Sequence, residues 1–189
     1  MKKIKSLLID NGSESIDKYA DVFNMCDITT VDLSKLGETD TSKFQLIILS
    51  DGHLISAYKN TAELNLVATA HVPIIGICYG FQILGVAYGA QLEKSDGMIE
   101  GMHNINTKTN HALFCDKTCF TVYEKHRYSI KKIPNDSKIK CLADSTNGCE
   151  IIEIKGRNFF GFQFHPEITA DNNEGSIILE NLLNHLFAE

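Results

Sequence analysis

The sequence is poor in the features that mark disordered or nucleic-acid-binding proteins. It has only three prolines among 189 residues and no low-complexity run, so neither disorder nor a fibrous repeat is expected. It also lacks clustered positive charge, because its formal net charge is -6 and Lys131 and Lys132 stand as an isolated pair. Binding to nucleic-acid phosphates depends on clustered Lys and Arg, so we expect no nucleic-acid partner.

Long hydrophobic runs are also missing. The longest apolar stretches, around residues 46–49 and 72–78, are far shorter than the roughly 20 residues that cross a bilayer. Near the N-terminus, Asp10 and Asn11 interrupt the chain before a signal-peptide core of adequate length, and no small-residue cleavage site follows. We therefore expect no membrane segment and a cytoplasmic location.

Cysteine is too scarce here for a small protein held together by disulfides. The chain has six, and we expect all of them to be reduced. One group of side chains offers zinc-ligand chemistry, namely His103, His111, Cys115 and Cys119. These residues lack the paired Cys-x-x-Cys spacing usual in structural zinc sites. We therefore expect buried small cysteines and surface histidines there, and no metal site.

Apolar runs and helical spacings alternate through the first half of the chain, which is typical of a parallel α/β sheet. The segment 5–10 is a buried apolar run that stops at the turn pair Asn11-Gly12, and apolar residues at helical spacing follow it. The expected strands are 5–10, 28–33, 44–50 and 72–77, and the expected helices are 16–23, 61–70 and 81–89.

The second half carries shorter β-like segments and a C-terminal helix. Strands are expected at 102–107, 119–123, 139–143, 150–155 and 159–164, and a helix with one apolar stripe at 175–187. Because we see no repeat and no linker, we expect one domain over residues 1–189. Its expected class is α/β, with a mostly parallel central sheet flanked by helices and extra β-strands from the C-terminal half.

A candidate nucleophile lies where one of these strands meets a helix. The turn Gly76-Ile77-Cys78-Tyr79-Gly80 is the thiol form of a nucleophile elbow. Its glycines remove Cβ atoms that would collide with the strand and helix. At a helix N-terminus the thiolate of Cys78 is favoured, and the N–H of Tyr79 can face an oxyanion. The same pattern also fits a tight turn whose cysteine is merely small and buried.

A candidate base ends the aromatic segment 159–164, at His165-Pro166-Glu167. Sites in parallel α/β sheets lie beyond the carboxyl ends of the strands, so Cys78 and His165 can meet although they are far apart in sequence. Imidazole can take the thiol proton and deliver it to a leaving amine, while Glu167 fixes its tautomer. A lone histidine is more often an ordinary polar residue, but the order Cys, His, Glu favours a catalytic role.

Two motifs carry a resemblance to a known family. Gly-Ile-Cys-Tyr-Gly-Phe-Gln at 76–82 and Phe-Gln-Phe-His-Pro-Glu at 162–167 resemble class I glutamine amidotransferases, and the likeness runs from residue 8 to about residue 187. The opening segment 8–14 looks like the start of the glutaminase part of GMP synthetase. The resemblance implies a flavodoxin-like fold and release of ammonia from glutamine. Cys78 would form a γ-glutamyl thioester, His165 would be general base and acid, and Glu167 would orient His165.

The resemblance also implies a substrate pocket. Gln82 would hold the α-amino or carboxylate end of glutamine, Gly52 and Tyr79 would supply oxyanion N–H groups, and His126 would line the glutamine pocket. It implies no metal and no cofactor in this chain. ATP and magnesium are expected only on a partner synthetase subunit.

The chain departs from the family pattern in two places. Ser50-Asp51-Gly52-His53 stands where Ser-Gly-Gly-Pro is usual, and Arg127-Tyr128 where Gly-Asp is usual. Two interpretations stay open for the first. Either the resting loop is misdirected until partner docking or glutamine binding turns the Gly52 N–H inward, or Asp51 caps the next turn and the oxyanion hole is already formed.

Three functions are compatible with this sequence. A chain of 189 residues has no room for a nucleotide-activating domain, so we expect the ammonia acceptor on another polypeptide, first of all GMP synthetase, with anthranilate, carbamoyl phosphate and other partners as alternatives. A stand-alone hydrolase of γ-glutamyl compounds or peptides is the second function. A regulatory protein with a lapsed site is the third, motivated by Asp51, His53 and Arg127 and opposed by the intact catalytic set.

Overall fold

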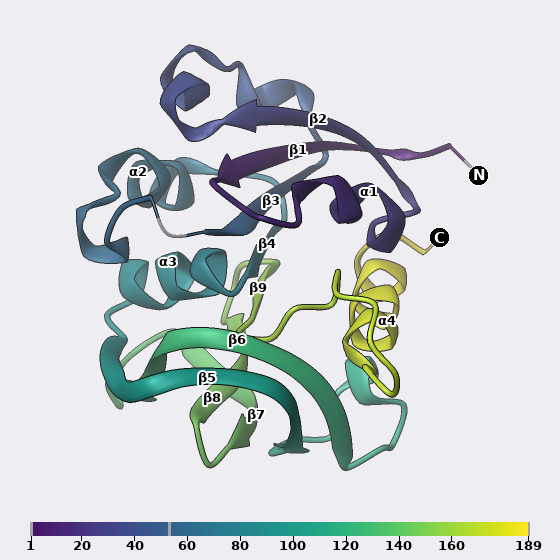
Figure 1. The fold of residues 1–189 in the computed structure, drawn as a ribbon. Helices are drawn as coiled ribbons and strands as arrows, with labels where there is room; N and C mark the ends of the chain where they lie inside the picture. Colours follow the sequence, from purple (N-terminus) through teal and green to yellow (C-terminus); the bar gives the residue numbers. More distant parts are fainter. Residues whose placement is uncertain (1, 53, 189) are drawn as a thin grey trace.

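A nine-stranded sheet runs through the computed structural model, which describes residues 2–52 and 54–188 (Figure 1). The strand order is β2-β1-β3-β4-β9-β8-β6-β5-β7. The first five strands in that order are parallel, and they are β2 (Cys26–Asp32), β1 (Ile4–Asn11), β3 (Leu46–Gly52), β4 (Ile74–Ile77) and β9 (Phe159–Phe162). The pairing of β4 with β9 places the two sequence motifs side by side.

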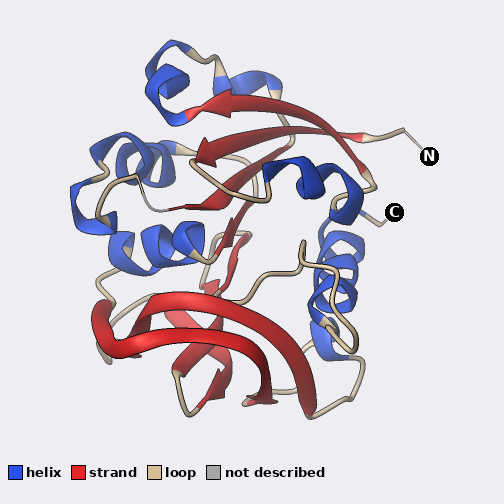
Figure 2. Cartoon of the chain, viewed as in Figure 1, coloured by secondary structure: helices blue, strands red, loops and turns tan. Residues whose placement is uncertain are grey.

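The other four strands are antiparallel and extend the same sheet (Figure 2). They are β5 (Gln91–Thr107), β6 (Cys119–Lys132), β7 (Ile139–Ser145) and β8 (Gly148–Ile154). Strand β7 pairs with both β5 and β8, so this part of the sheet folds back on itself. The expected α/β fold, with extra strands from the second half, is confirmed.

Helices cover the parallel strands on both faces. The α-helices are α1 (Tyr19–Val22), α2 (Thr61–Thr69), α3 (Tyr79–Ala87) and α4 (Gly175–Phe187). In the described part of the chain, short 3-10 helices accompany them: η1 (Ile16–Lys18), η2 (Leu33–Glu38), η3 (Thr41–Lys43), η4 (Ala57–Lys59) and η5 (Ala112–Phe114). Within the described ranges, no helix is long and apolar enough to cross a membrane.

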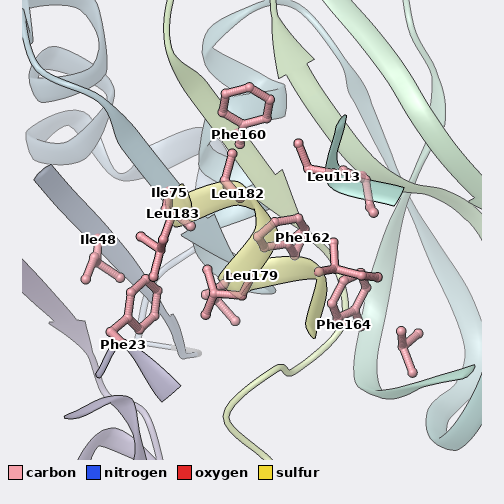
Figure 3. Packing of buried hydrophobic residues seen from close by; sticks show 14 of the residues in the cluster. Phe23, Ile48, Ile75, Leu113, Phe160, Phe162, Phe164, Leu179, Leu182 and Leu183 are labelled. Carbon is pink, nitrogen blue, oxygen red and sulfur yellow. The ribbon is translucent and has the colours of Figure 1, made fainter. Parts of the chain in front are cut away.

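Two hydrophobic cores form because successive side chains of a strand point to opposite faces of the sheet. In β4, Ile75 packs into the core beneath α1 and α4, whereas Ile74 packs into the core beneath α2 and α3. Figure 3 shows part of the first core, to which α4 contributes Leu179 and Leu182 and β9 contributes Phe162. Burial on both faces explains why the inner parallel strands β1, β3, β4 and β9 contain apolar runs, whereas the edge strand β2 is mostly polar and exposed.

Candidate active site

Cys78 occupies a strained turn between β4 and α3. Its φ is +48°, a region that side chains other than glycine rarely adopt. The two flanking glycines permit this geometry. A Cβ on Gly76 would lie 2.4 Å from the carbonyl carbon of Gly80, and a Cβ on Gly80 would lie 2.3 Å from the carbonyl oxygen of Leu49. The turn therefore has the close packing that the motif predicts.

His165 and Glu167 follow the end of β9 and form a buried pair. The Nδ1 of His165 lies 2.6 Å from Oε1 of Glu167, and both side chains are almost fully buried. The backbone N–H of His165 donates to the carbonyl of Tyr123 at 2.8 Å, which ties the loop after β9 to β6. The imidazole is thus fixed in orientation from two sides.

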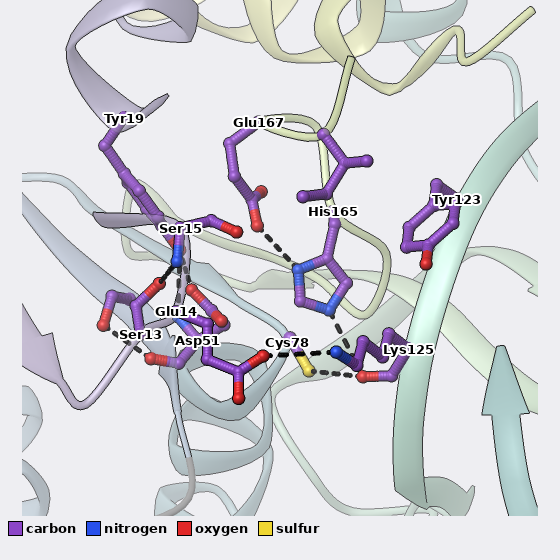
Figure 4. A network of polar contacts seen from close by, with 12 residues as sticks. Ser13, Glu14, Ser15, Tyr19, Asp51, Cys78, Tyr123, Lys125, His165 and Glu167 are labelled. Atoms are coloured by element: carbon purple, nitrogen blue, oxygen red, sulfur yellow. Dashed lines mark hydrogen bonds and ion pairs between the residues drawn. The ribbon is translucent and has the colours of Figure 1, made fainter. Parts of the chain in front are cut away.

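The structure brings Cys78 and His165 together at one carbonyl oxygen, that of Lys125 in β6 (Figure 4). The Sγ of Cys78 lies 3.8 Å from this oxygen, and the Nε2 of His165 lies 3.3 Å from it. The side chain of Lys125 reaches across the site, and its Nζ pairs with Glu14 at 3.2 Å. Lys125 was not among the residues predicted from the sequence, because its contribution is a backbone carbonyl that any residue could supply.

The electrostatic setting of His165 favours its protonated form. Burial acts to lower the pKa of His165, but its interactions with Cys78 and Glu167 outweigh burial and raise that pKa well above its ordinary value. A protonated imidazole donates through both nitrogens, which matches its contacts with the Glu167 carboxylate and the Lys125 carbonyl.

A cavity of about 750 Å³ opens in front of Cys78, and His165 also lines it. All four predicted substrate-binding residues lie in its wall, namely Gly52, Tyr79, Gln82 and His126. Two of them, Gln82 and His126, contact the same backbone carbonyl, that of Tyr128. Gln82 donates from Nε2 to the carbonyl of Tyr128 at 3.0 Å, and the ring of His126 contacts that carbonyl at 3.1 Å and Glu124 at 2.9 Å.

The departure at 50–53 has a structural setting that neither sequence interpretation anticipated. Asp51 has no positive φ, and its carboxylate accepts a hydrogen bond at 2.8 Å from the hydroxyl of Tyr19, which in turn accepts one from the Asp51 N–H at 2.9 Å. The carboxylate is therefore bonded to α1. Gly52 has φ +155°, and a Cβ there would lie 2.1 Å from the carbonyl oxygen of Asn11, so glycine is required. His53 lies outside the described residues, and the inward turn of the Gly52 N–H stays a prediction.

A buried polar network supports the elbow from behind. Glu63 of α2 accepts hydrogen bonds from Asn11 at 3.0 Å and Asn60 at 2.8 Å, and Asn60 also donates to the hydroxyl of Tyr79 at 3.0 Å. Burial raises the pKa of Glu63 to about 7. Sequence reasoning missed this network, since its members come from separate segments and form no local motif.

Two groups of side chains bring potential metal-ligand atoms within 4.8 Å of one another in the described part of the chain. One is Asp51 with His165 and Glu167, where Nδ1 of His165 is already bonded to Glu167. The other is Glu124 with His126 and Glu150, all buried. Burial, and then the charge of Glu124, raise the pKa of Glu150 to about 8, so a proton can neutralise this carboxylate pair.

The four residues considered for zinc do not gather into such a group within residues 2–52 and 54–188. The expectation that their cysteines are buried was wrong: Cys115 is exposed and Cys119 is only partly buried. Cys115 follows the short helix η5 in a left-handed turn, with φ +46°, which places it at the surface.

Known proteins that resemble this chain are glutamine amidotransferases. The family model described as Glutamine amidotransferase class-I matches residues 7–185. A subunit of the glutamine-hydrolysing GMP synthase of Methanocaldococcus jannaschii is 28% identical over 93% of this chain and 94% of its own length. Its namesake from Methanobrevibacter smithii is 33% identical over 71% of this chain and 70% of its own. A glutamine amidotransferase from Thermotoga maritima has the same fold, with a TM-score of 0.79, 16% identity and full coverage of both chains.

Proposed function

This chain belongs to the class-I glutamine amidotransferase family, and we propose from that membership that it is the glutamine-hydrolysing subunit of a two-subunit synthetase. In this proposal Cys78, His165 and Glu167 form the catalytic triad. Ammonia released from glutamine passes to a separate ATP-dependent polypeptide, which uses it to make GMP from XMP.

The proposed chemistry has two half-reactions. The Cys78 thiolate attacks the γ-carboxamide carbon of glutamine, and the N–H groups of Tyr79 and Gly52 stabilise the oxyanion. His165 then donates its proton to the amide nitrogen, which leaves as ammonia and yields the γ-glutamyl thioester. In the second half, His165 takes a proton from water, the hydroxide attacks the thioester carbon, and glutamate leaves while the thiolate is restored.

The observation that carries the proposal is the convergence of the thiol and the imidazole. Cys78 and His165 lie against the same carbonyl oxygen, and Glu167 holds the far side of the ring at 2.6 Å. Both groups lie beyond the carboxyl ends of β4 and β9, where sites of parallel α/β sheets are built. A merely structural cysteine would need neither the strained φ nor the oriented base.

Support for a protein partner comes from the surface around the cavity. Among the described residues, five of the seven exposed large hydrophobic side chains line the cavity. They are Leu54, Ile55, Tyr58, Met98 and Tyr128. Exposed apolar side chains that gather at one place favour a contact with another protein. The relatives from Methanocaldococcus jannaschii and Methanobrevibacter smithii are each one subunit of a glutamine-hydrolysing GMP synthase, which favours the XMP-aminating polypeptide as that partner.

Labelling by a diazoketone analogue of glutamine tests the assignment of the nucleophile. The reagent should modify Cys78 alone, and excess glutamine should protect it, because modification requires both the pocket and the activated thiol. The variant Cys78→Ala should remain folded, incorporate no label and lose ammonia release by about 10⁴-fold or more. The exposed Cys115 provides the matched control, since Cys115→Ala should label like the wild type. Modification of Cys115, Cys119 or Cys141 in place of Cys78 would show that the elbow assignment is wrong.

A further inference from the structure

Two cysteines outside the active site touch across the hairpin formed by β7 and β8. Cys141 lies in β7 and Cys149 in β8, and their sulfur atoms are 2.6 Å apart. Both are free thiols in the structure. This separation is far shorter than ordinary contact between sulfur atoms, so little movement would be needed to form a bond of about 2.05 Å.

Irregular pairing of the two strands produces this contact. The register of β7 and β8 shifts on both sides of Ala143, so that Cys141 pairs with Ile152 and Cys149 with Asp144. Bulges of this kind change the direction in which side chains point, compared with regularly paired strands. Each sulfur also contacts a carbonyl of its own strand, Cys141 at Ala143 (3.2 Å) and Cys149 at Ile151 (3.5 Å).

The two thiols differ in accessibility and in acidity. Cys141 is partly exposed, whereas Cys149 is buried. The hydrogen bond from Cys149 lowers the pKa of the Cys141 thiol, outweighing the effect of its own burial. Burial first, and the neighbouring Cys141 second, raise the pKa of the Cys149 thiol well above its ordinary value. An accessible thiol of lowered pKa beside a second cysteine is the arrangement found in redox-sensitive thiol pairs.

Charges near the pair act in opposite directions. Lys108 lowers the pKa of Cys141, and Asp144 raises it. These two residues pair with each other at 2.5 Å, so their effects on the thiol partly offset one another. The contact with Cys149 is therefore the main feature that distinguishes Cys141 from an ordinary half-exposed cysteine.

We propose that Cys141 and Cys149 form a reversible disulfide when the protein meets hydrogen peroxide, with Cys141 as the thiol that is oxidised first and Cys149 as the thiol that resolves it. The pair is a second reactive thiol centre, separate from Cys78. It needs no ligand in the glutamine pocket, and it does not depend on the proposed function.

The chemistry balances without any further reagent. The Cys141 thiolate attacks one oxygen of hydrogen peroxide and breaks the O–O bond, which gives a sulfenic acid and hydroxide. Hydroxide takes the proton of Cys149, and the resulting thiolate attacks the sulfur of Cys141 and expels a second hydroxide. In sum, one thiolate, one thiol and one peroxide become one disulfide, one water and one hydroxide. A dithiol reductant reverses the step by exchange.

The sequence around the pair makes the product simple to observe. Trypsin cuts after Lys140 and Lys155, and no lysine or arginine lies between them, so one peptide of residues 141–155 contains both cysteines. The experiment treats the full chain with hydrogen peroxide, alkylates the remaining thiols under denaturing conditions, digests with trypsin and measures peptide masses. The disulfide appears as this peptide without alkyl groups and lighter by two hydrogen atoms than the reduced, unalkylated form.

The expected result is that the crosslinked peptide accumulates about tenfold faster than the exposed Cys115 loses its ability to be alkylated. Dithiothreitol should restore two alkyl groups to the peptide. The variant Cys149→Ser should leave Cys141 as a sulfenic acid that a dimedone-type reagent traps, whereas the control Cys115→Ser should crosslink like the wild type. Recovery of the peptide with two alkyl groups after Cys115 is fully oxidised would overturn the proposal. So would a disulfide that joins Cys141 to any cysteine other than Cys149.

Discussion

The ring of His165 contacts other groups of the candidate site through both of its nitrogens, and these surroundings set its pKa. Its Nδ1 faces Glu167 at 2.6 Å, its Nε2 faces the Lys125 carbonyl at 3.3 Å, and the opposing effects on its pKa resolve in favour of the protonated ring. A protonated imidazole beside a cysteine can deliver a proton to departing ammonia, which neutral imidazole cannot. The position of Glu167 therefore bears directly on the pH range in which the enzyme should work.

The substitution Glu167→Gln is expected to lower kcat for glutamine hydrolysis by about 10²–10⁴-fold, since the ring loses both its orienting partner and a stabilising charge. Glu167 raises the pKa of His165, so removing it should lower that pKa and move the alkaline limb of the pH profile to lower pH. The measurement is kcat against pH for both proteins. Glu14→Gln is the control, because Glu14 contacts Lys125 and not the ring. An alkaline limb that stays in place would show that Glu167 does not act through His165.

The residues of the proposed triad could be named from the sequence because each lies in a short local motif, and the structure brings their side chains together. The contacts of Asp51 could not. Its carboxylate binds Tyr19, which belongs to a different segment, and no rule about turns links the two. The contacts of the Lys125 carbonyl could not be predicted either, because every residue type has the same backbone carbonyl.

Among the connections between secondary-structure elements, the turn from β4 to α3 requires especially small residues, because Cβ atoms at its two glycines would overlap the backbone. The helix lies so close to β3 that a Cβ on Gly80 would overlap the backbone of Leu49. The sequence predicts this turn because glycines at fixed positions indicate a close approach. Strand β5 was predicted only in part, as 102–107 in place of Gln91–Thr107. Its first half has no fully buried residue and only scattered partly buried ones, so it has no alternating apolar pattern to detect.

The substitution Gly80→Ala should destabilise the protein by about 1–3 kcal/mol, because the new methyl group must push α3 away from β3. It should also abolish glutamine hydrolysis, since the elbow moves with the helix. Gly97→Ala is the matched control: a Cβ there meets no atom within 4 Å, so stability and rate should stay close to the wild type. Urea unfolding and a glutaminase assay would check both. Equal stability of the two variants would contradict the tight packing of the elbow.

Glu124 of β6 and Glu150 of β8 are both buried and lie close together. This pair makes the free energy of unfolding depend on pH. The pKa of Glu150 rises from 4.5 to about 8 on folding, so between these values the folded protein holds a proton that the unfolded chain has lost. Stability from this group is fully present below pH 4.5 and is lost as the pH rises towards 8.

Glu150→Gln should remove this dependence. Between about pH 5 and pH 7, the free energy of unfolding of the wild type should fall relative to that of the variant by on the order of 1–3 kcal/mol. Glu153→Gln provides the control on the same strand, because Glu153 is half-buried and pairs with Lys140 at 3.6 Å. Denaturant unfolding at several pH values measures the difference. Parallel curves for wild type and Glu150→Gln would rule out a proton held by Glu150.

For the whole molecule, the sheet order explains how residues 78 and 165 form one site. Strands β4 and β9 are neighbours and parallel, so both chain segments leave the sheet at the same edge and open into the same cavity. The class of the fold followed from the sequence pattern because parallel strands buried on both faces have a strong apolar signature. The folding back of β7 onto both β5 and β8 did not follow, since strand pairing depends on register and twist that no single segment specifies.

The exposed apolar side chains that favour a partner contact line the same cavity as Cys78. A synthetase that docks there could shift β6, whose Lys125 carbonyl now lies against both Cys78 and His165. We therefore expect glutamine hydrolysis to be slow in the isolated chain and faster in the complex.

The most direct test mixes this chain with the ATP-dependent GMP synthetase polypeptide from the same source and measures glutamate and GMP formed from glutamine, XMP and ATP-magnesium. The proposed function predicts that the partner raises glutamine hydrolysis at least about tenfold, a typical size for such coupling. It also predicts that Cys78→Ala abolishes GMP formation from glutamine while the mixture still makes GMP from added ammonia. A fast hydrolysis of glutamine or γ-glutamyl peptides by the isolated chain, unchanged by the synthetase, would contradict it and favour a stand-alone hydrolase.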